Sequence, residues 1–517
     1  MVRADNAARA MDAGSQAIRE LDSRIMPLIP FGEYRPDVSD YEGQATRNIR
    51  NVIPRGDGYG PFPGLSTYTS ALPSTCRGAF YAMKDNGSVV TFAGTSTVSG
   101  SKLYKLDNTN YTWTDVSLGT GTYSALTATA QWQFAQFGSL VFATQKNAPL
   151  QVYDLSSSSA FADCAGSPPQ ASYISVVGRF LVLSGLLDHP YRIHWSGLNA
   201  TTTWTSGTNS SDYQDFPDGG IVRGVAGGEH GIVFQDQAIR RMSYVPGSPL
   251  IFQIDRITQD KGLFAPYSII RAGERIFFYA GQGFHKIEPG GVPEQIGREK
   301  VDRSFLADLD KGNLQLFIGA ADPRSTRVYW AYKSVSGAVG TAYDKLLGYD
   351  FLLDRFFPVS VSGEYLLGIS QTGLTLENLD SISSSLDALT LSLDAYATAV
   401  QPEIGQFNGS HALGFFRGAN LEATIESAEQ GTDESSITIR GFRPVTDAAT
   451  VYGSVSYRDT PSAPVVSGAE VPVNTRTGRC DVMRDTRYSR FKVRIPAETS
   501  WTFCAGVVPD LTTGGTL

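Results

Sequence analysis

The motifs that would mark a catalytic or metal site are missing from this sequence. No two histidines have the His-x-x-x-His or His-Glu-x-x-His spacing that places two metal ligands on one helix face. The Gly-x-Ser-x-Gly turn of a hydrolase nucleophile and the phosphate loop ending in Gly-Lys-Ser/Thr do not occur. We therefore expect a chain that is not an enzyme, with no catalytic, cofactor-binding or metal-binding residue. The histidines are His189, His194, His230, His285 and His411.

The four cysteines, Cys76, Cys164, Cys480 and Cys504, lie far apart and form no Cys-x-x-Cys unit. Four cysteines in 517 residues do not make a disulfide framework, so buried free thiols are expected. Cys480 and Cys504 could still face each other across one small domain.

Short apolar runs between glycine-rich turns dominate the middle of the chain, most clearly over residues 219–287. Runs of β-branched and aromatic residues bounded by such turns predict strands, arranged here as antiparallel meanders. A turn glycine followed by an apolar run recurs about every 40 to 50 residues, the period of four-stranded propeller blades. The phrase begins at Gly87, Gly138, Gly178, Gly231 and Gly273, and more loosely at Arg327.

A single four-stranded blade cannot bury both of its faces, so blades must stack around an axis to form a core. We therefore predict an all-β chain with a β-propeller of about six or seven blades. Aromatic residues that end several blades are expected to fill the gaps between them: Trp113, Trp204, Phe252 and Phe357. The recognisable blades are residues 76–116, 131–164, 172–206, 221–257, 268–297 and 314–361.

A propeller can also bring paired carboxylates together from different blades, as propeller glycosidases do. Asp and Glu are plentiful at the turns of this chain, where they are ordinary turn formers. The repeated Ser-x-Asp-x-Gly turn of sialidase-type propellers is absent.

The propeller is expected to span residues 61–417. Residues 1–60 are expected to form a short amphipathic helix, over residues 5–24, and then an extended arm rich in Pro, Gly and Arg. This arm would lie on its own propeller or dock on a neighbouring subunit. The blade period is absent from residues 418–517, where residues alternate in the pattern of strands. This predicts a C-terminal antiparallel β-sandwich or barrel.

A Leu-Asp repeat with a seven-residue period lies at residues 376–394. Its leucines would form a seam on a helix, yet Leu389, Leu391 and Leu393 also alternate as in a strand, and serine-rich stretches are poor helix formers. The pattern leaves helix and strand open. Its carboxylates could form a cation site or simply a solvated edge.

The chain carries a formal net charge of −8 and no basic stripe, which a protein that grips nucleic acid by neutralising phosphates would need. No apolar run approaches the roughly 18 residues of a membrane-spanning helix. The first residues include no apolar signal segment. We expect neither membrane insertion nor secretion.

Residues 194–257 and 261–287 resemble a family of short-tailed bacteriophage (podovirus) proteins, the packaged-DNA stabilisation or tail hub (nozzle) proteins. The resemblance covers about residues 45–508 and is closest over 172–290, while the first ~45 residues look like an addition to the family pattern. The matching landmarks are GYGPFPGLSTY at 58–68, LYKLD at 103–107, the Trp-Ser-Gly-Leu-Asn…Trp phrase at 195–204, DGGIVRGV from Asp218, the Ser-Leu-Asp phrase at 385–394 and the C-terminal β domain.

The resemblance implies a non-enzymatic structural protein of the virion tail, assembled in the cytoplasm of the host bacterium. Members of the family form a ring, expected to be a hexamer, below the portal and adaptor (head-to-tail connector) proteins. They close the head after DNA packaging, form part of the DNA ejection channel, and help to seat the tail fibres or tailspikes and the tail tip or needle. The alternative is a propeller-type glycan-binding or glycan-cleaving receptor protein of the virion.

A channel subunit should let DNA pass without specific binding, because each phosphate neutralised by Lys or Arg adds affinity. Carboxylates and hydroxyls are therefore expected to line the bore of the ring. Arg240 and Arg241 are expected elsewhere, at a subunit contact or in a salt bridge.

Overall fold

The computed structural model describes residues 28–39, 45–338, 340–371, 401–431 and 435–516, and nearly all regular structure in these residues is β. Residues 64–418 form one compact unit, and the residues on either side of this segment together form a second. The helix expected over residues 5–24 and the Leu-Asp repeat at 376–394 lie outside the described residues.

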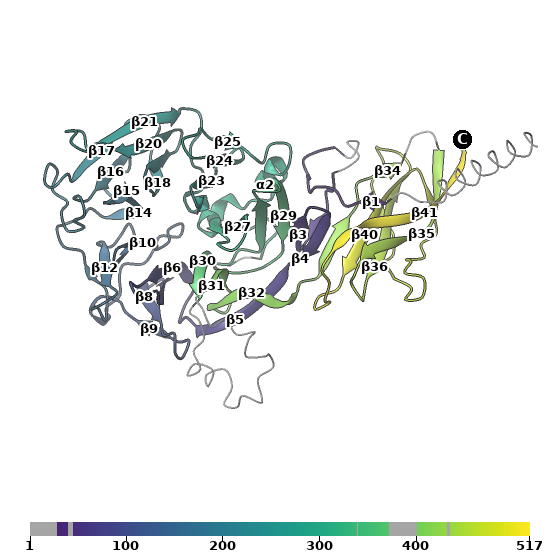
Figure 1. Cartoon of the computed structure of the whole chain (residues 1–517), viewed down its shortest axis with the longest axis horizontal. Coiled ribbons are helices and arrows are strands. Elements are labelled where there is room, and N and C mark those ends of the chain that lie inside the picture. Colours follow the sequence, from purple (N-terminus) through teal and green to yellow (C-terminus); the bar gives the residue numbers. More distant parts are fainter. Residues whose placement is uncertain (1–27, 40–44, 339, 372–400, 432–434, 517) are drawn as a thin grey trace, which may run out of the picture. The chain divides into compact units, whose positions relative to one another are not determined.

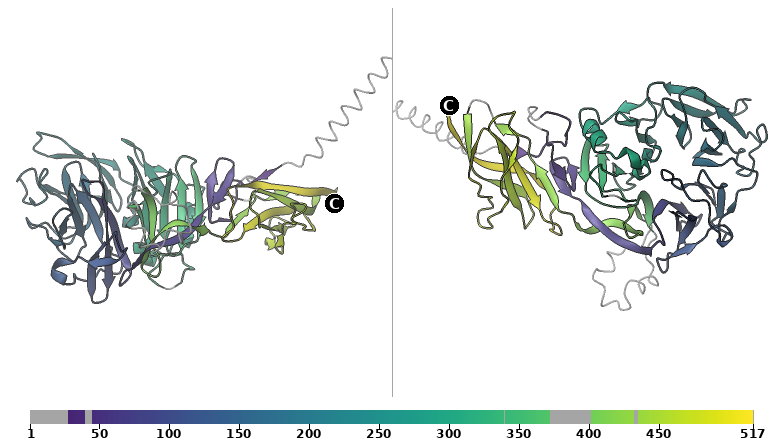
Figure 2. Two further views of the ribbon diagram at one scale, coloured as in Figure 1. Left: turned by 60° about the horizontal axis from the view of Figure 1, so that its bottom comes forward. Right: turned by 180° about the vertical axis from the view of Figure 1, so that it is seen from behind.

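The first unit is a β-propeller whose described residues form seven four-stranded antiparallel sheets. In six of these sheets the strands follow one another along the chain, so each of these blades is a simple meander. First strands of most neighbouring blades contact each other, and Figures 1 and 2 show the blades arranged in a ring. The predicted all-β propeller is confirmed.

The six meander blades lie close to their predicted positions, and the strands of each blade follow one another from the inner strand outward. Blade one is β6 (Cys76–Met83), β7 (Val89–Thr97), β8 (Gly100–Leu106) and β9 (Trp113–Asp115); blade two is β10 (Gln133–Phe137), β11 (Leu140–Thr144), β12 (Gln151–Asp154) and β13 (Ala162–Asp163); blade three is β14 (Ala171–Val177), β15 (Phe180–Leu186), β16 (Arg192–Trp195) and β17 (Asp212–Asp215). Blade four is β18 (Val222–Ala226), β19 (Gly231–Gln235), β20 (Ile239–Tyr244) and β21 (Phe252–Thr258); blade five is β22 (Ile270–Ala272), β23 (Arg275–Tyr279), β24 (Phe284–Ile287) and β25 (Glu294–Gln295); blade six is β26 (Ile318–Ala321), β27 (Arg327–Tyr332), β28 (Lys345–Asp350) and β29 (Arg355–Val359).

Short helices occur only in connections within the described residues: η2 (Leu118–Thr120), η3 (Pro266–Ser268), α2 (Asp302–Asp308) and η4 (Lys311–Leu316). None of the described helices has both the length and the apolar character needed to span a membrane.

Of the recurrent glycines, Gly87, Gly138, Gly178 and Gly273 lie in the hairpin between the first and second strands of a blade, whereas Gly231 is the first residue of β19. Gly138 and Gly178 have φ angles of 59° and 55°. This left-handed conformation disfavours residues with a Cβ atom. The repeated glycine therefore reflects the geometry of one hairpin used in successive blades.

Aromatic side chains fill the spaces on both sides of blade five. Phe277 and Phe278 are consecutive on β23 and therefore face opposite sides of the sheet. Phe278 packs on Phe234 of blade four with ring centroids 5.0 Å apart. Phe277 packs on Tyr349 of blade six at 6.0 Å. Both phenylalanines are fully buried, so one ring anchors each side of the blade.

Three of the four aromatic residues predicted to fill the gaps between blades lie between blades. Trp204 belongs to the core between blades two and three, and Phe252 to the core between blades three and four. Phe357 is fully buried and packs on Tyr329 of its own blade, with ring centroids 5.8 Å apart. Trp113 packs on Phe407, in blade seven, with centroids 5.7 Å apart.

Blade seven is assembled from distant parts of the chain. Its strands are β30 (Tyr365–Gln371), β31 (Gln401–Phe407), β32 (Ala412–Asn420) and, as outermost strand, β5 (Pro63–Ala71). Because β5 precedes blade one, its pairing with β32 closes the ring. The blade period does not reveal this sheet, because its strands are not contiguous in the sequence.

A buried carboxylate fixes the junction between blades seven and one. The side chain of Glu364, directly before β30, is 3% exposed. Its Oε2 accepts the backbone N–H of Cys76 at 2.9 Å, and its Oε1 lies 2.6 Å from Nδ1 of His411. The backbone oxygen of His411 accepts the N–H of Leu72 at 2.9 Å. Glu364 thus connects the last blade, the first blade and the residue that follows β5.

The second unit is a β-sandwich. One sheet has the order β3-β4-β41-β35-β39, with β1 also pairing with β41; the other has the order β2-β33-β40-β36-β37, with β34 and β38 paired to β40 and β36. Phe442 and Phe491, from the two sheets, meet with centroids 5.2 Å apart. The strands are β1 (Ile29–Pro30), β2 (Ile49–Arg50), β3 (Val52–Arg55), β4 (Gly58–Pro61), β33 (Ala423–Glu426), β34 (Gln430–Gly431), β35 (Ser435–Thr446), β36 (Tyr452–Arg458), β37 (Val466–Ser467), β38 (Val471–Pro472), β39 (Arg484–Thr486), β40 (Tyr488–Ile495) and β41 (Cys504–Thr516).

Residues 29–61 do not form the separate extended arm that the sequence suggests. β1 and β4 pair with β41, and β2 pairs with β33, so both ends of the chain build one sandwich. The boundaries expected near 60 and 418 mark where the chain enters and leaves the propeller. Pro- and Gly-rich composition indicates irregular chain, but it cannot reveal pairing with strands at the other end of the sequence.

Truncating one of the rings beside blade five tests the inter-blade core. We expect Phe278→Ala to destabilise the protein by about 3 to 5 kcal/mol, because a fully buried ring is lost and leaves a cavity. Val98→Ala, at a fully exposed site, should change stability by less than about 0.5 kcal/mol. Denaturant unfolding midpoints measure both, and equal midpoints for the two variants would contradict the packing.

Glu364→Gln tests the junction between blades seven and one through pH. Burial raises the pKa of Glu364, although the Cys76 N–H and His411 oppose the shift. Above the ordinary glutamate pKa of about 4.3, the folded chain therefore holds a proton that the unfolded chain has released. Stability from this group is then greatest at low pH and falls as pH rises through the raised pKa.

The glutamine keeps a hydrogen-bonding side chain but does not titrate. We expect the melting temperature of the natural protein, minus that of Glu364→Gln, to decrease as pH rises from about 4 to 7. Glu274→Gln, at an exposed position, controls for the loss of one charge. A difference that increases with pH would show that the shift has the opposite sign.

Candidate functional site

The histidines are structural or exposed. Nε2 of His194 lies 3.0 Å from the backbone oxygen of Trp204, and Nδ1 of His285 lies 3.0 Å from that of Gly283. Burial lowers the pKa of both rings. A third histidine belongs to the blade-seven junction, and the remaining two are exposed. Among the described residues, no group of three or more His, Cys, Asp or Glu side chains could hold a metal ion.

All four cysteines are free and buried, which confirms the prediction and leaves Cys480 and Cys504 unbridged. Burial raises the thiol pKa of Cys164 to about 11 and those of Cys480 and Cys504 to about 12, and it also raises that of Cys76. Because the thiolate is the nucleophile, these thiols are unreactive at neutral pH.

Side chains from non-adjacent blades meet on the propeller axis. The backbone N–H of Gln131, before blade two, donates to the hydroxyl of Tyr267, before blade five, at 3.0 Å. The side-chain amide of Gln131 donates to the backbone oxygen of Gln315, before blade six. Blades two and five are not neighbours in the ring of seven, so these contacts span its centre. We call Gln131, Tyr267 and Gln315 the axial plug.

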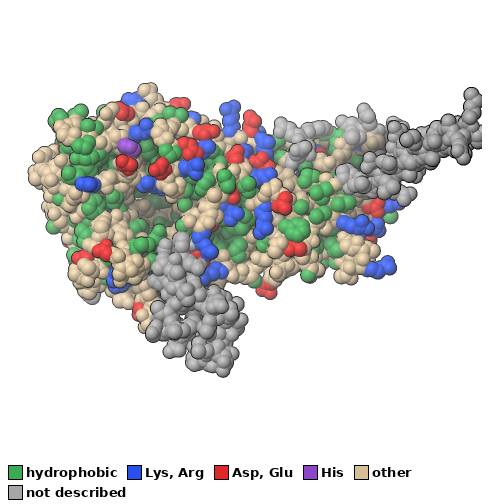
Figure 3. Space-filling model, in the orientation of Figure 1, with side chains coloured by type: hydrophobic (Ala, Val, Ile, Leu, Met, Phe, Trp, Pro, Cys, Tyr) green, Lys and Arg blue, Asp and Glu red, His purple; other side chains and the backbone are tan. Residues whose placement is uncertain are grey.

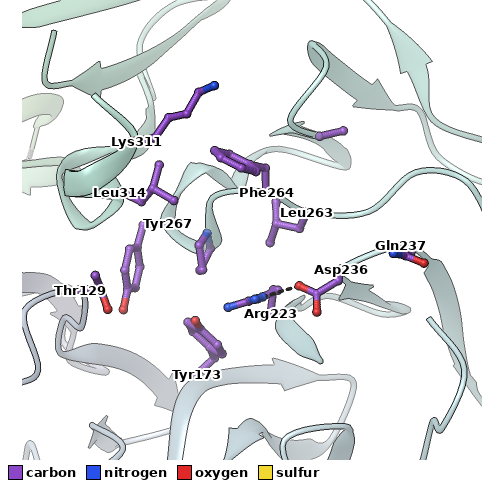
Figure 4. Close-up of a pocket in the computed structure, with 12 residues that line it drawn as sticks. Thr129, Tyr173, Arg223, Asp236, Gln237, Leu263, Phe264, Tyr267, Lys311 and Leu314 are labelled. Atoms are coloured by element: carbon purple, nitrogen blue, oxygen red, sulfur yellow. Dashed lines mark hydrogen bonds and ion pairs between the residues drawn. The ribbon is translucent and has the colours of Figure 1, made fainter. Parts of the chain in front are cut away.

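A cavity of about 500 Å³, the axial pocket, lies beside this plug. Figure 4 shows the guanidinium of Arg223 extending toward Tyr173 and Tyr267, with Thr129 beside Tyr267. Phe264, Leu314 and Lys311 lie in the upper part of the view, with Leu314 next to Tyr267. These residues come from five of the blades or the segments that enter them, so the ring as a whole builds the pocket.

Arg223 is the central charge of the axial pocket. Its Nε donates to Oδ1 of Asp236 at 2.6 Å, and Oδ2 of Asp236 accepts the N–H of Ile221 at 3.0 Å. The carboxylate is therefore occupied. The terminal nitrogens of Arg223 have no partner within the part of the chain that the structure describes.

Two tyrosine hydroxyls face the same space. Tyr173 and Tyr267 pack with ring centroids 6.1 Å apart. Burial raises the pKa of Tyr267 to about 12 and also raises that of Tyr173. Both hydroxyls therefore keep their protons at neutral pH and can donate hydrogen bonds.

A second cavity, of about 540 Å³, lies between blades four and five. Its two arginines, Arg241 and Arg271, donate to the backbone oxygens of Gly291 and Gly227 at 3.0 and 2.6 Å. Glutamates also line this cavity, so its charge is mixed.

The salt bridge expected for Arg240 is present. Its Nη2 lies 2.7 Å from Oδ1 of Asp218, and its Nε donates to Gln235 at 2.8 Å. Arg241 has a backbone partner instead. On the face shown in Figure 3, Lys and Arg side chains are interspersed with Asp and Glu and form no basic stripe.

The residues of the axial pocket did not stand out in the sequence, because they lie far apart and only the closed ring brings them together. One signal was present: Arg223 interrupts the apolar inner strand β18, within the DGGIVRGV phrase. The five histidines, in contrast, are not brought into one site.

No protein-family model matches the chain, and no curated protein matches its sequence. Among solved structures, the extracellular domain of a protein described as a one-component system of B. thetaiotaomicron has a TM-score of 0.39 and 10% identity, covering 74% of this chain and 43% of that one. A chain of a mitotic checkpoint complex has a TM-score of 0.34 and 10% identity, covering 72% and 96%. Hydrazine synthase of Kuenenia stuttgartiensis has a TM-score of 0.34 and 14% identity, covering 55% and 79%. None of these matches bears on function, and the fold assignment rests on the strand pairing itself.

Thiol labelling tests the state of the cysteines. We expect no rapid reaction of the folded chain with a disulfide reagent at about pH 8, because the thiols are buried and protonated. After unfolding in denaturant without reductant, all four should react. Two reactive thiols in the unfolded chain would reveal a disulfide, and fast labelling of the folded chain would contradict the burial.

Proposed function

We propose that this chain is a structural protein of a short-tailed bacteriophage tail, a hub or nozzle subunit. It forms a ring, expected to be sixfold, below the portal and adaptor proteins. The ring closes the head after DNA packaging and forms part of the ejection channel. The observation that supports this proposal is the sequence resemblance over residues 172–290, which falls on blades three to five.

The resembling phrases coincide with residues that hold the blades together. Trp195 is buried in the core between blades three and four, and Trp204 in the core between blades two and three. Asp218 opens the DGGIVRGV phrase and pairs with both Arg240 and Arg256. The resemblance therefore concerns packing and ion pairs, which supports a shared architecture and says little about chemistry.

The axial plug determines where DNA could pass in the proposed ring. Side chains cross the centre of the propeller, so DNA would pass beside each propeller, through a bore enclosed by several subunits. In the proposed ring, the sides of each propeller would make the heterologous contacts that close the ring. The mixed-sign surface on the face in Figure 3 suits DNA that slides past without being held.

The axial pocket gives little support to the glycan-cleaving alternative. Glycoside hydrolysis by the common mechanism uses two facing carboxylates. Asp236 is the one carboxylate among the described residues that line the axial pocket, and it is occupied by Arg223 and by a backbone N–H.

Phage particles produced without this chain test the proposal. We expect packaged heads that lose their DNA, measured as nuclease-sensitive genome, because the ring that retains it is missing. Adding the purified chain back should restore nuclease protection, whereas the destabilised Phe278→Ala variant should restore less. Heads that keep their DNA but fail to bind host polysaccharide would contradict the proposal and favour the receptor alternative.

A further inference from the structure

We propose that the axial pocket is a binding site for a small organic anion, which it holds by a carboxylate head on Arg223 and by an apolar body against Phe264. This inference stands on the pocket alone and does not depend on a role in a tail.

The charge of the pocket favours an anion. Its charged lining residues within the described part of the chain are Arg223, Lys311 and Asp236, two cations and one anion, so the wall carries a net charge of +1. Asp236 has both oxygens occupied by the Arg223 guanidinium and the Ile221 N–H. The charge that remains available to a ligand is therefore that of the cations.

The hydrogen-bonding groups that remain open are donors. Arg223 uses only Nε on Asp236, which leaves the two terminal nitrogens of its guanidinium facing the pocket. Tyr267 accepts the N–H of Gln131 through its oxygen, and its own proton remains to be donated. The hydroxyl of Tyr173 has no partner among the described residues. The planar guanidinium of Arg223 and the two neighbouring hydroxyls can donate hydrogen bonds to both oxygens of a carboxylate.

Part of the pocket wall is apolar. Leu263 is buried, whereas Phe264 is 36% exposed, and both line the cavity together with Leu314. A volume of about 500 Å³ lies in the range of pockets that bind small molecules. The pocket thus offers both an oxyanion clamp and a hydrophobic surface, so a ligand with both parts should bind best.

Calorimetry on the full chain with three probes tests the proposal: benzoate, acetate and inorganic phosphate. We expect saturable binding of benzoate with a dissociation constant of about 1 mM or tighter. Acetate and phosphate should bind at least about tenfold more weakly, because neither can use the apolar wall.

Three variants locate the binding. Arg223→Gln should weaken benzoate binding by about tenfold or more, because it removes the charged fork. Tyr173→Phe removes one hydroxyl and should weaken it about two- to tenfold. Arg192→Gln is the matched control: its Nε and Nη2 are both held by Asp215, at 2.6 and 2.8 Å, on strand β16 of blade three. It should leave the affinity unchanged.

Melting temperatures establish that each variant is folded, and a double variant, Arg223→Gln with Asp236→Asn, replaces Arg223→Gln if the single change unfolds the chain. The absence of saturable benzoate binding by the natural protein would overturn the proposal. So would benzoate affinity that is equal in Arg223→Gln and the natural protein, or phosphate binding as tight as benzoate binding, which would leave no role for the apolar wall.

Discussion

Closure of the ring is the constraint on which the rest of the propeller depends. Each blade buries both faces against its neighbours, so an open ring would expose two faces and the edge of β32. The outermost strand of blade seven comes from the start of the propeller, and Glu364 binds the first blade and the turn of the last. The same pairing brings the entry and exit of the chain together, since a Cβ on Gly418 would lie 3.1 Å from the backbone oxygen of Gly64. The segments that build the sandwich therefore leave the propeller side by side.

Closure of the ring also brings together the residues on the propeller axis. Segments that enter blades two, five and six can meet on the axis only when all blades are in place, and there they form the axial plug. The plug occupies the space that wider propellers leave as a channel, and the axial pocket is what remains beside it. Loss of the β5–β32 pairing should therefore disturb the pocket as well as blade seven, although the two lie in different parts of the sequence.

The six contiguous blades were predictable because each contains its own turns and apolar runs. The glycine at 178 and the paired phenylalanines at 277 and 278 reflect local geometry that any blade of this kind requires. Blade seven and the sandwich were not fully predictable, because β5 and β1 pair with strands that lie hundreds of residues away in the sequence. The pocket was hidden for the same reason, because its lining residues come from five blades and only the closed ring brings them together.

We propose that propellers of this kind form a ring around the DNA path, and a reconstruction of the tail within the phage particle tests this proposal most directly. We expect sixfold density for this chain below the portal and adaptor, with each propeller axis crossed by density at Gln131, Tyr267 and Gln315 and with DNA running outside the individual propellers. Threefold density at the distal fibres, or DNA threaded through a propeller axis, would contradict it.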